Sequence, residues 1–216
     1  MSLFNPYKFK HFFYNKYVLS FFKRKRYFIS YHYNYKALWF RTYKVASRTI
    51  DDMLKKQNED GCYIYASDMA YSPSMFKDYF KFAFVRNPET RFVSAWKDKV
   101  LRQNYFHFSE KEHKKMKDID HFIIWVKSLD IENCDEHLRC QLSLVDVENM
   151  DFIGKFENFE ADFNYVIKRL KVPNYEMEFL NQGIKKEFEL SEKQKNDIRT
   201  IYHMDFEQFY PQMNNN

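Results

Sequence analysis

Two short basic segments of the chain carry residue types that bind anions. The first, KVASRT at residues 44–49, combines a lysine and an arginine with two hydroxyl side chains. The second begins at Arg86 and continues through RNPETRFVS to Ser94. A guanidinium can hold a phosphate or sulfate through two parallel hydrogen bonds, and a lysine adds a compact point charge. The two segments therefore predict two separate sites for phosphate-like groups.

Each basic segment follows a predicted strand and precedes a predicted helix. Before the first, ALWFRTY at residues 37–43 is an apolar and aromatic run typical of a buried strand, and Ile50, Met53 and Leu54 then follow helical spacing. We expect Ser47 to be the N-cap of that helix. The first N–H groups of a helix have no partner inside it and favour anions. The expected binding loop comprises Lys44, Val45, Ala46, Ser47, Arg48 and Thr49.

The second junction has a stronger local signature. FKFAFV at residues 80–85 predicts a strand, and Asn87, Pro88 and Glu89 then provide an N-cap, a first-turn proline and a first-turn acid. Arg86 thus stands between strand and helix, and Ser94 lies two turns into that helix. With a further short strand at residues 62–66, the alternation predicts an α/β fold whose central, mainly parallel sheet is flanked by helices. Ligands then bind at the carboxyl ends of the strands.

The remaining pattern is helical with one more strand. We expect a solvated, charged connection at residues 109–117, helices at 119–129 and 159–170, and a strand at 152–156. Ser191 and Gln194 form a capping box ahead of the apolar positions Ile198, Ile201, Tyr202 and Phe206. The last three residues, 214–216, are expected to fray.

Charge is distributed unevenly along the 216 residues. Residues 1–50 contain eleven Lys or Arg and no Asp or Glu, so the net charge of +5 leaves 5 − 11 = −6 for the rest. We expect a basic, aromatic N-terminal arm at 1–36, one domain at 37–211 and a tail at 212–216. The N-terminal arm contains no uncharged run that approaches the ~20 residues needed to span a bilayer. Its aromatic and basic residues do suit a peripheral contact with an anionic membrane. The odd cysteine number favours a reducing, cytoplasmic setting over a disulfide-bonded one.

Four segments together resemble a known family. KVASRT, FAFVRNPETRFVSAW, FIGKFENFEADF and YHMDFEQFYP are similar, in order and spacing, to the carbohydrate sulfotransferases of the Golgi type and their bacterial relatives. The resemblance covers roughly residues 37–211. It implies a P-loop-like three-layer fold and in-line transfer from 3'-phosphoadenosine 5'-phosphosulfate (PAPS) to a carbohydrate hydroxyl without a metal. It also implies that the loop with Lys44 binds the 5'-phosphosulfate, and that Arg86 and Ser94 bind the 3'-phosphate. Arg48 stands where relatives often have a small residue.

The acceptor hydroxyl needs a general base, for which the sequence offers two candidates. Asp68 lies just after the second predicted strand, where relatives commonly carry a histidine; burial would have to raise the pKa of this acid for it to act near neutral pH. His137 is followed by Gln four residues on, in EHLRCQ, which resembles a family segment lining the active cleft. Cys134, His137 and Cys140 also have a spacing that suits zinc, but no fourth ligand follows, and we expect no metal site.

Two other classes of function remain open from the sequence. Strand, phosphate loop and helix also describe P-loop kinases, although the glycines of their signature are missing and residues 1–60 contain no Gly at all. The basic aromatic head could alternatively make the chain a binding module for an anionic membrane or a nucleic acid. Of these partners the composition permits a peripheral membrane contact, the alternative being a basic surface arm packed by its own aromatic residues, and we expect no nucleic acid.

Overall fold

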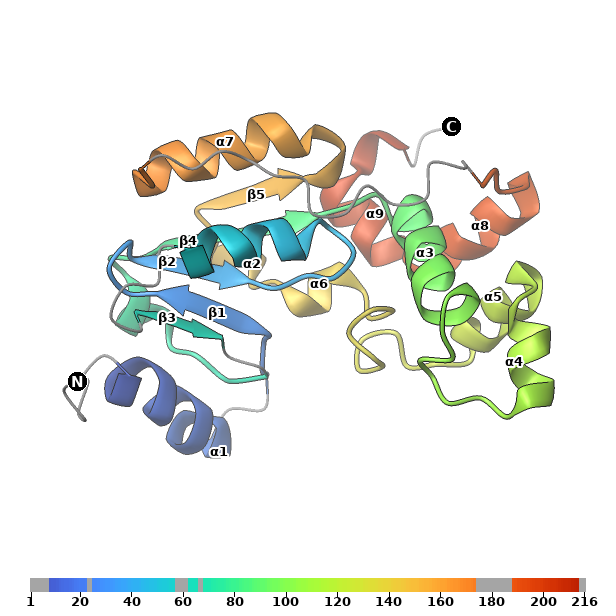
Figure 1. Ribbon diagram of the computed structural model, residues 1–216, viewed down its shortest axis with the longest axis horizontal. Helices are drawn as coiled ribbons and strands as arrows, with labels where there is room; N and C mark the ends of the chain where they lie inside the picture. Colours follow the sequence, from blue (N-terminus) through green and yellow to red (C-terminus); the bar gives the residue numbers. More distant parts are fainter. Residues whose placement is uncertain (1–7, 23–24, 57–61, 66–67, 174–187, 214–216) are drawn as a thin grey trace. The chain divides into compact units, whose positions relative to one another are not determined.

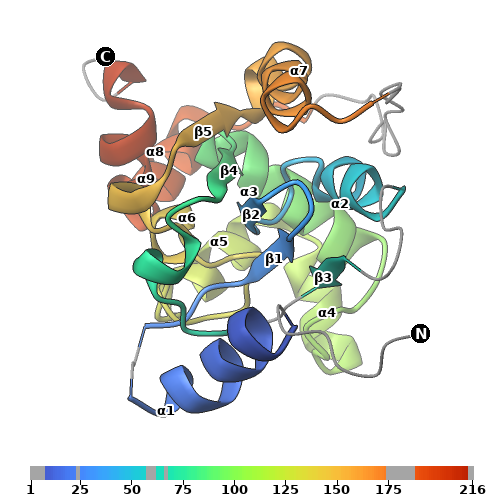
Figure 2. The same cartoon turned by 90° about the vertical axis from the view of Figure 1, so that its left-hand side faces the viewer.

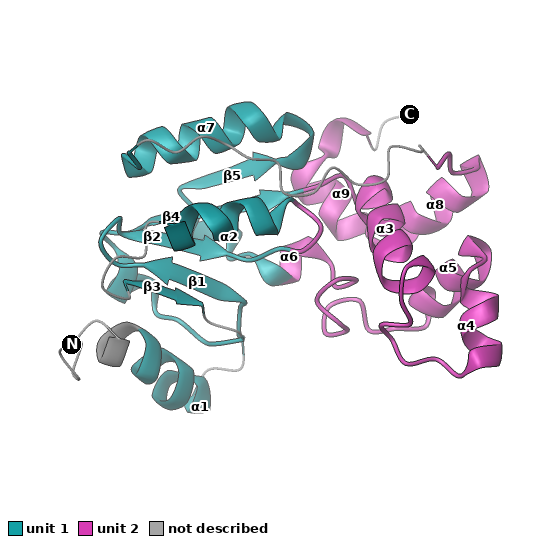
Figure 3. Cartoon of the chain, in the orientation of Figure 1, with its two compact units in different colours: residues 1–42, 46–85, 144–181 teal, residues 43–45, 86–143, 182–216 magenta. Residues whose placement is uncertain are grey.

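The computed structural model describes residues 8–22, 25–56, 62–65, 68–173 and 188–213. Its chain forms two compact units, each built from segments that are far apart in the sequence (Figure 3). Unit 1 comprises residues 1–42, 46–85 and 144–181, and unit 2 comprises residues 43–45, 86–143 and 182–216. Each unit is described by itself below.

Unit 1 contains a five-stranded sheet in the order β3-β1-β2-β4-β5. Its strands are β1 (Ile29–His32), β2 (Ala37–Phe40), β3 (Tyr63–Tyr65), β4 (Phe80–Val85) and β5 (Phe152–Lys155). β2 pairs in parallel with β4 and β4 with β5, whereas β1 runs antiparallel to both of its neighbours. Four strands therefore point the same way and β1 alone is reversed, so the predicted α/β fold with a mainly parallel sheet is confirmed.

Helices cover this sheet on both sides. Figure 2 shows α2 (Ser47–Lys56) and α7 (Phe159–Leu170) on the same side, with Ile50, Met53, Phe163 and Val166 buried. A second apolar cluster includes Tyr31, Phe40, Tyr71, Phe76 and Leu144, and partly buried residues such as Phe12 pack against it. Short helices complete the unit at Pro73–Phe76, Val147–Asn149 and Phe156–Asn158. The sheet is thus buried from both sides, which is typical of parallel strands.

Unit 2 is helical in its described residues. It contains α3 (Pro88–Trp96), which continues as a π-helical turn at Lys97–Leu101, then α4 (Glu110–Met116), α5 (Ile119–Lys127), α8 (Glu192–Ile201) and α9 (His203–Phe209), with a closing 3₁₀ turn at Pro211–Met213. α3 and α5 both contact α8 (Figure 1). Rings of Phe92, Phe122 and Trp125 pack at centroid distances of 5.3 and 5.5 Å in its core. The short helix α6 (Gln141–Leu144) stands at the boundary of the two units in the sequence.

Several predicted elements are confirmed and others need correction. The strands at 37–43, 80–85 and 152–156 correspond to β2, β4 and β5, and the predicted helices correspond to α2, α3, α5, α7 and α8. The charged segment at 109–117 is not a connection but α4, which starts with a capping box between Ser109 and Glu112 and buries none of its residues. The stripe from Ile198 to Phe206 is divided between α8 and α9 at Tyr202.

The N-terminal region also differs from the sequence expectation. Ile29–His32, inside the segment taken as an arm, forms β1, whose four residues are all buried between β2 and β3. Before it, Lys8–Leu19 forms a π-helix that continues into α1 (Ser20–Phe22). The predicted frayed tail at 214–216 and Ala66 of the predicted strand 62–66 lie outside the described residues.

Candidate functional site

The topology of the sheet points to the ends of β2 and β4. From β2 the chain continues to β3 on one side of the sheet, and from β4 it continues to β5 on the other. Such a reversal between neighbouring parallel strands is the usual place for ligands in α/β sheets. Phe40 of β2 pairs with Ala83 of β4, and beyond this pair the Thr42 hydroxyl donates a hydrogen bond to the Phe84 carbonyl. The two basic segments therefore leave the sheet from adjacent positions.

The loop after β2 has a strained backbone. Lys44 has a φ of 69° and Ala46 a φ of 60°, both in the left-handed region that non-glycine residues rarely adopt. Each such residue costs on the order of 1–2 kcal/mol relative to a relaxed conformation. The loop makes these turns without a glycine, and its conformation is held by hydrogen bonds from neighbouring segments.

The start of α2 differs from the prediction at Ser47. The helix begins at Ser47 itself, and the carbonyl of Ala46 accepts from the N–H groups of Thr49 and Ile50 at 2.9 and 3.4 Å. Ser47 is therefore not the N-cap. Its hydroxyl donates instead to the Thr42 carbonyl at 2.7 Å, which ties the helix to the end of β2. Arg48 is exposed on this first turn, whereas Thr49 is only 2% exposed.

Lys44 belongs to unit 2, where its ammonium group has an acidic partner. Lys44 Nζ lies 3.0 Å from Asp98 Oδ2, in the π-helical turn that extends α3. Burial lowers the pKa of Lys44 below its ordinary value, the ion pair with Asp98 opposes this, and the charges of Lys99 and Arg86 lower it further. Asp98 also contacts Lys99 and Arg102 at 3.7 and 3.4 Å. One carboxylate is thus shared by three cations, so an incoming anion can replace it at Lys44.

The two basic segments meet at Arg86. Arg86 Nη1 donates to the carbonyl oxygen of Lys44 at 3.1 Å, and Arg86 Nε donates to Thr90 Oγ1 at 3.0 Å. Asn87 caps α3 by accepting from the N–H groups of Glu89 and Thr90, and Pro88 occupies the first turn, as predicted. The guanidinium therefore lies beside the backbone of the first anion loop. Lys44 and Arg86, one basic residue of each segment, are thus joined within unit 2.

A buried acid positions the backbone of Arg86 through a glutamine. The side-chain amide of Gln141 accepts from the Arg86 N–H and donates to the Arg86 carbonyl, each at 2.8 Å. Asp205 of α9, which is fully buried, accepts from the backbone N–H groups of Gln141 and Leu142 at 2.9 and 2.8 Å. Burial raises the pKa of Asp205, while Arg91 and these hydrogen bonds oppose the rise. The closing segment YHMDFEQFYP therefore acts as a support for Arg86.

Gln141 and Asp205 were not among the predicted site residues. Both lie in segments that the sequence had already marked: Gln141 follows His137 by four residues, and Asp205 stands in the last of the four family-like segments. Their positioning role required the tertiary contact, because they are separated by 64 residues.

The two other polar residues of α3 have different surroundings. Arg91 is 1% exposed and donates from Nε to the Tyr43 carbonyl at 3.1 Å and from Nη2 to the Glu136 carbonyl at 3.3 Å. Arg91 therefore holds the backbone of two distant segments, at Tyr43 and at Glu136. Ser94 is partly exposed on the second turn of α3, and its role as a ligand stays a prediction.

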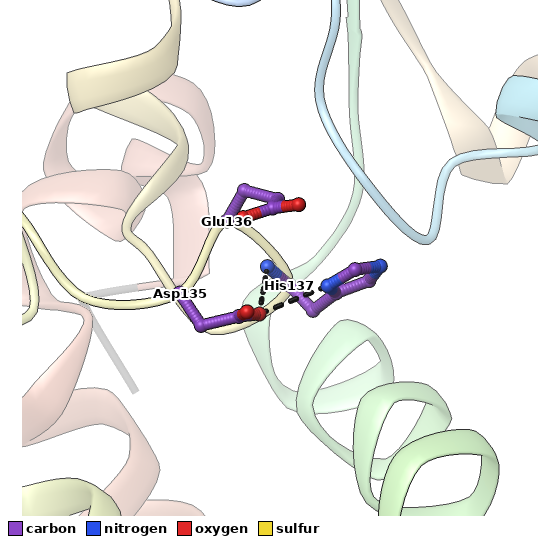
Figure 4. Close-up of side chains that lie close together, drawn as sticks. All are labelled: Asp135, Glu136 and His137. Atoms are coloured by element: carbon purple, nitrogen blue, oxygen red, sulfur yellow. Dashed lines mark hydrogen bonds and ion pairs between the residues drawn. The ribbon is translucent and has the colours of Figure 1, made fainter. Parts of the chain in front are cut away.

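His137 is held in one orientation by the acid two residues before it. Asp135 Oδ1 lies 2.9 Å from His137 Nδ1 and accepts from the backbone N–H of His137 at 2.9 Å (Figure 4). Burial alone would raise the pKa of Asp135, but its hydrogen bonds with His137 and Tyr105 and the charge of His137 lower it below the ordinary value. An ionised carboxylate at Nδ1 selects the tautomer with its proton on Nδ1, so Nε2 carries a lone pair.

Aromatic rings enclose this imidazole. Tyr43 lies 4.7 Å and Tyr105 5.1 Å from the ring of His137, measured between centroids, and the His137 side chain is 12% exposed. Burial and the nearby charges of Asp135 and Glu136 raise the pKa of Tyr105 to about 12. Figure 4 shows the far ring nitrogen of His137 directed away from Asp135 and Glu136. Among the described residues, this Nε2 atom has no hydrogen-bond partner, so it can accept a proton from a bound hydroxyl.

Asp68, the other candidate base, has a different environment. Its side chain is 46% exposed and lies 3.8 Å from Arg26, which is equally exposed. Asp68 therefore lacks the burial that would have to raise its pKa for it to act as the base. Asp68 belongs to unit 1, whereas His137 belongs to unit 2.

The possible zinc ligands do not converge. Within the described part of the chain, one set of three groups has its ligand atoms within 4.8 Å of one another, and it consists of Asp135, Glu136 and His137 without either thiol. Burial raises the pKa of Cys134 to about 11 and also raises that of Cys140. Both thiols are then protonated near neutral pH, whereas zinc binds the thiolate. Cys62, Cys134 and Cys140 are all free.

These features define an α/β protein in which two basic strand-to-helix junctions follow adjacent parallel strands. Residues 15–211 match the sulfotransferase family, and the chain belongs to that family. The resemblance inferred from the four sequence segments is thus confirmed, and the family match extends further toward the N-terminus than those segments did. No helix in the described ranges combines the length and the apolar character needed to cross a membrane.

The chain is also similar to named members of this family. Carbohydrate sulfotransferase 14 of Danio rerio is 25% identical over 162 residues, which are 63% of this chain and 43% of that protein. Carbohydrate sulfotransferase 14 of Homo sapiens is 25% identical over 158 residues, covering 62% of this chain and 41% of the human protein. Human carbohydrate sulfotransferase 9 is 28% identical over 167 residues, with coverages of 61% and 37%. The chain thus spans less than half the length of these curated relatives. No solved structure matches it.

Proposed function

We propose that this chain transfers a sulfuryl group from PAPS to a hydroxyl of a carbohydrate or glycoconjugate. The observation that carries the proposal is the hydrogen bond from Arg86 to the Lys44 carbonyl, because it joins one basic residue of each segment within unit 2. The donor has a 5'-phosphosulfate and a 3'-phosphate, which are two anionic groups on one molecule. The names of the similar proteins support a carbohydrate as the acceptor.

The donor-binding roles follow from the chemistry of each side chain. Arg86 holds the 3'-phosphate bidentately, with the Ser94 hydroxyl as a second donor. The loop from Lys44 to Thr49 binds the 5'-phosphosulfate through its hydroxyls and N–H groups. Lys44 leaves Asp98 and places its charge beside the oxygen that bridges sulfur and phosphorus. This charge stabilises the leaving phosphate as the bond breaks.

In this mechanism His137, rather than Asp68, removes the proton of the acceptor hydroxyl. The acceptor oxygen attacks sulfur while its proton moves to Nε2 of His137, and the sulfur–oxygen bond to the 5'-phosphate breaks. The products are a sulfate ester and 3'-phosphoadenosine 5'-phosphate. The carboxylate of Asp135 stabilises the imidazolium that forms, as carboxylates do for general-base histidines elsewhere. His137 is preferred because its orientation is fixed, whereas Asp68 is exposed and ion-paired.

Calorimetric binding of 3'-phosphoadenosine 5'-phosphate without metal tests the donor site. We expect wild type to bind and Arg86→Ala to lose about 10- to 100-fold in affinity, the effect of a charged hydrogen bond worth about 1.5–3 kcal/mol. Arg102→Ala is the matched control, because the Arg102 side chain is 66% exposed and forms an ion pair with the shared Asp98. Absence of binding to wild type, together with magnesium-dependent binding of ATP, would support the kinase alternative instead.

Kinetics of PAPS turnover test the base. His137→Gln keeps a polar side chain of similar size, and we expect its kcat to fall by about 10²–10⁴-fold with unchanged affinity for the product nucleotide. Asp68→Asn should retain wild-type kcat. The assignment is wrong if Asp68→Asn is the inactive variant, or if both variants remain fully active with an acceptor that wild type sulfates.

A further inference from the structure

The N-terminal helical segment at Phe12–Phe22 exposes an unusual number of large apolar side chains. Eleven large hydrophobic residues are exposed in the described part of the chain, and six of them lie in this segment: Phe13, Tyr14, Tyr17, Val18, Phe21 and Phe22. Phe21 and Phe22 are 85% and 76% exposed. Single exposed hydrophobics are ordinary on soluble proteins, but a contiguous group of this kind marks an interaction surface.

These six residues share one face of the segment. Phe13, Tyr17 and Phe21 follow one another at intervals of four, and Tyr14, Val18 and Phe22 repeat the interval one position later. Side chains spaced in this way lie above one another along a helix. The face they form, called the aromatic face below, is therefore continuous from Phe13 to Phe22.

The opposite side of the segment is fixed to unit 1. Asn15 and Ser20 are buried, and Ser20 Oγ donates to the Asn15 carbonyl at 2.8 Å while it accepts from the Ala70 N–H at 3.0 Å. Phe12 packs against the apolar cluster of the sheet. Rotation of the segment to hide the aromatic face would break these contacts. The aromatic face is thus held toward the solvent.

A lysine borders the aromatic face, and the sequence around the segment is basic. Residues 1–28 contain seven Lys or Arg and no Asp or Glu. Lys16 Nζ lies 5.2 Å from the ring centroid of Phe12 and 5.9 Å from that of Tyr17, at the border of the face. Lys25 and Arg26 come three and four residues after the end of α1, and Arg26 is half-exposed beside Asp68. Apolar rings bordered by cations match the headgroup region of an anionic bilayer, where each basic residue contributes about 1 kcal/mol.

We propose that the aromatic face binds an anionic membrane surface peripherally, with Phe21 and Phe22 entering the headgroup region. The arrangement of the rings favours a bilayer over a single-stranded nucleic acid. The rings of Phe21 and Phe22 are 5.3 Å apart and meet edge to face at 84°, so they offer no common plane on which bases could stack. This surface is separate from the chemistry of transfer and would hold the protein at the membrane whatever its acceptor.

Vesicle sedimentation with the full chain tests this proposal. The probes are phosphatidylcholine vesicles and otherwise identical vesicles with about 30% phosphatidylserine, the acidic lipid of anionic membranes. We expect binding to the acidic vesicles that weakens as salt rises from about 0.1 to about 0.5 M, because the Debye length shortens. Phe21→Ser with Phe22→Ser should lower the partition coefficient at least about tenfold, since two apolar side chains no longer enter the bilayer.

The matched control replaces two other exposed hydrophobics, Ile124→Ser with Tyr165→Ser. These side chains are 67% and 47% exposed and lie outside the segment, so the control should bind vesicles as wild type does. Equal thermal unfolding of both double variants excludes a general loss of fold. The proposal is overturned if wild type ignores the acidic vesicles, if the Phe21/Phe22 variant binds them undiminished, or if the control loses as much. Binding of an oligothymidylate in place of vesicles would also overturn it.

Discussion

The two strand-to-helix junctions of this protein perform parallel tasks with different construction. At Arg86 the turn is built from local chemistry: Asn87 caps α3 with its own side chain, and Pro88 sets the first turn. At Lys44 the turn contains two left-handed residues and no glycine, and contacts from elsewhere in the sequence hold it. A locally encoded junction can be recognised in a sequence, whereas a strained loop persists only where the surrounding structure determines it.

The difference also extends to charge. The guanidinium of Arg86 donates hydrogen bonds to the Lys44 carbonyl and the Thr90 hydroxyl. The ammonium of Lys44 is paired with Asp98 and must leave it to serve a ligand. In the proposed mechanism Lys44 therefore changes its partner during the reaction, whereas Arg86 anchors the donor throughout.

Of the substitutions that compare the two junctions, Lys44→Ala has the largest expected effect. Lys44→Ala should lower kcat for PAPS turnover by about 10²–10³-fold, the usual loss when a donor to the developing charge is removed. Its affinity for 3'-phosphoadenosine 5'-phosphate, which lacks the sulfuryl group, should fall much less than that of Arg86→Ala. Lys55→Ala, on the exposed end of α2, is the control. Equal losses of affinity in both variants would erase the distinction between the junctions.

The pH dependence of Lys44 gives a second, smaller effect. Because burial lowers its pKa, the lysine loses its proton at a lower pH than a free lysine does. The charged form exists below this pKa, so binding of PAPS should weaken as the pH rises through it. Calorimetry across the alkaline range measures this decline, and Lys44→Arg should flatten it because arginine stays protonated. If the affinity of Lys44→Arg for PAPS declines by the same amount at the same pH, a group other than Lys44 causes the decline.

A cap deletion tests the local construction of the second junction. Asn87→Ala removes the acceptor for the Glu89 and Thr90 N–H groups, and we expect a loss of about 1 kcal/mol in the free energy of unfolding. Urea denaturation measures it. Asn87→Asp keeps an acceptor at the same place and should restore most of the stability; failure of this rescue would show that packing of the asparagine, rather than capping, matters.

The smallest effect tests the strain in the first junction. Ala46→Gly relieves the left-handed conformation but adds freedom to the unfolded chain, so the net gain should be about 0.5 kcal/mol or less. Ala95→Gly, a buried position inside α3, should instead destabilise by about 1 kcal/mol through the helix propensity alone. Thermal unfolding compares the pair. A clear destabilisation by Ala46→Gly would mean that the loop carries no strain at that residue.

Much of the fold could be predicted because its signals are local. The start of α3, the buried strands β2 and β4, and the capping box of α8 are each specified within a few residues. Two elements, α4 and β1, were not predicted, and the reason is clear for each. α4 carries the same kind of capping box as α8, but no buried residue marks an apolar face. β1 was missed because its short ISYH segment lies in a basic region and becomes buried only by pairing with β2 and β3.

The sequence by itself determined the α/β class, the two basic strand-to-helix segments and the family resemblance, since these depend on residue types at short spacing. The tertiary structure decided which of the two candidate bases is oriented: Asp135 fixes His137, whereas Asp68 remains exposed. It also decided that Gln141 and Asp205 hold Arg86, and that the aromatic face of the N-terminal segment points to solvent. These facts depend on burial and on contacts between residues far apart in the chain, and neither is contained in local sequence.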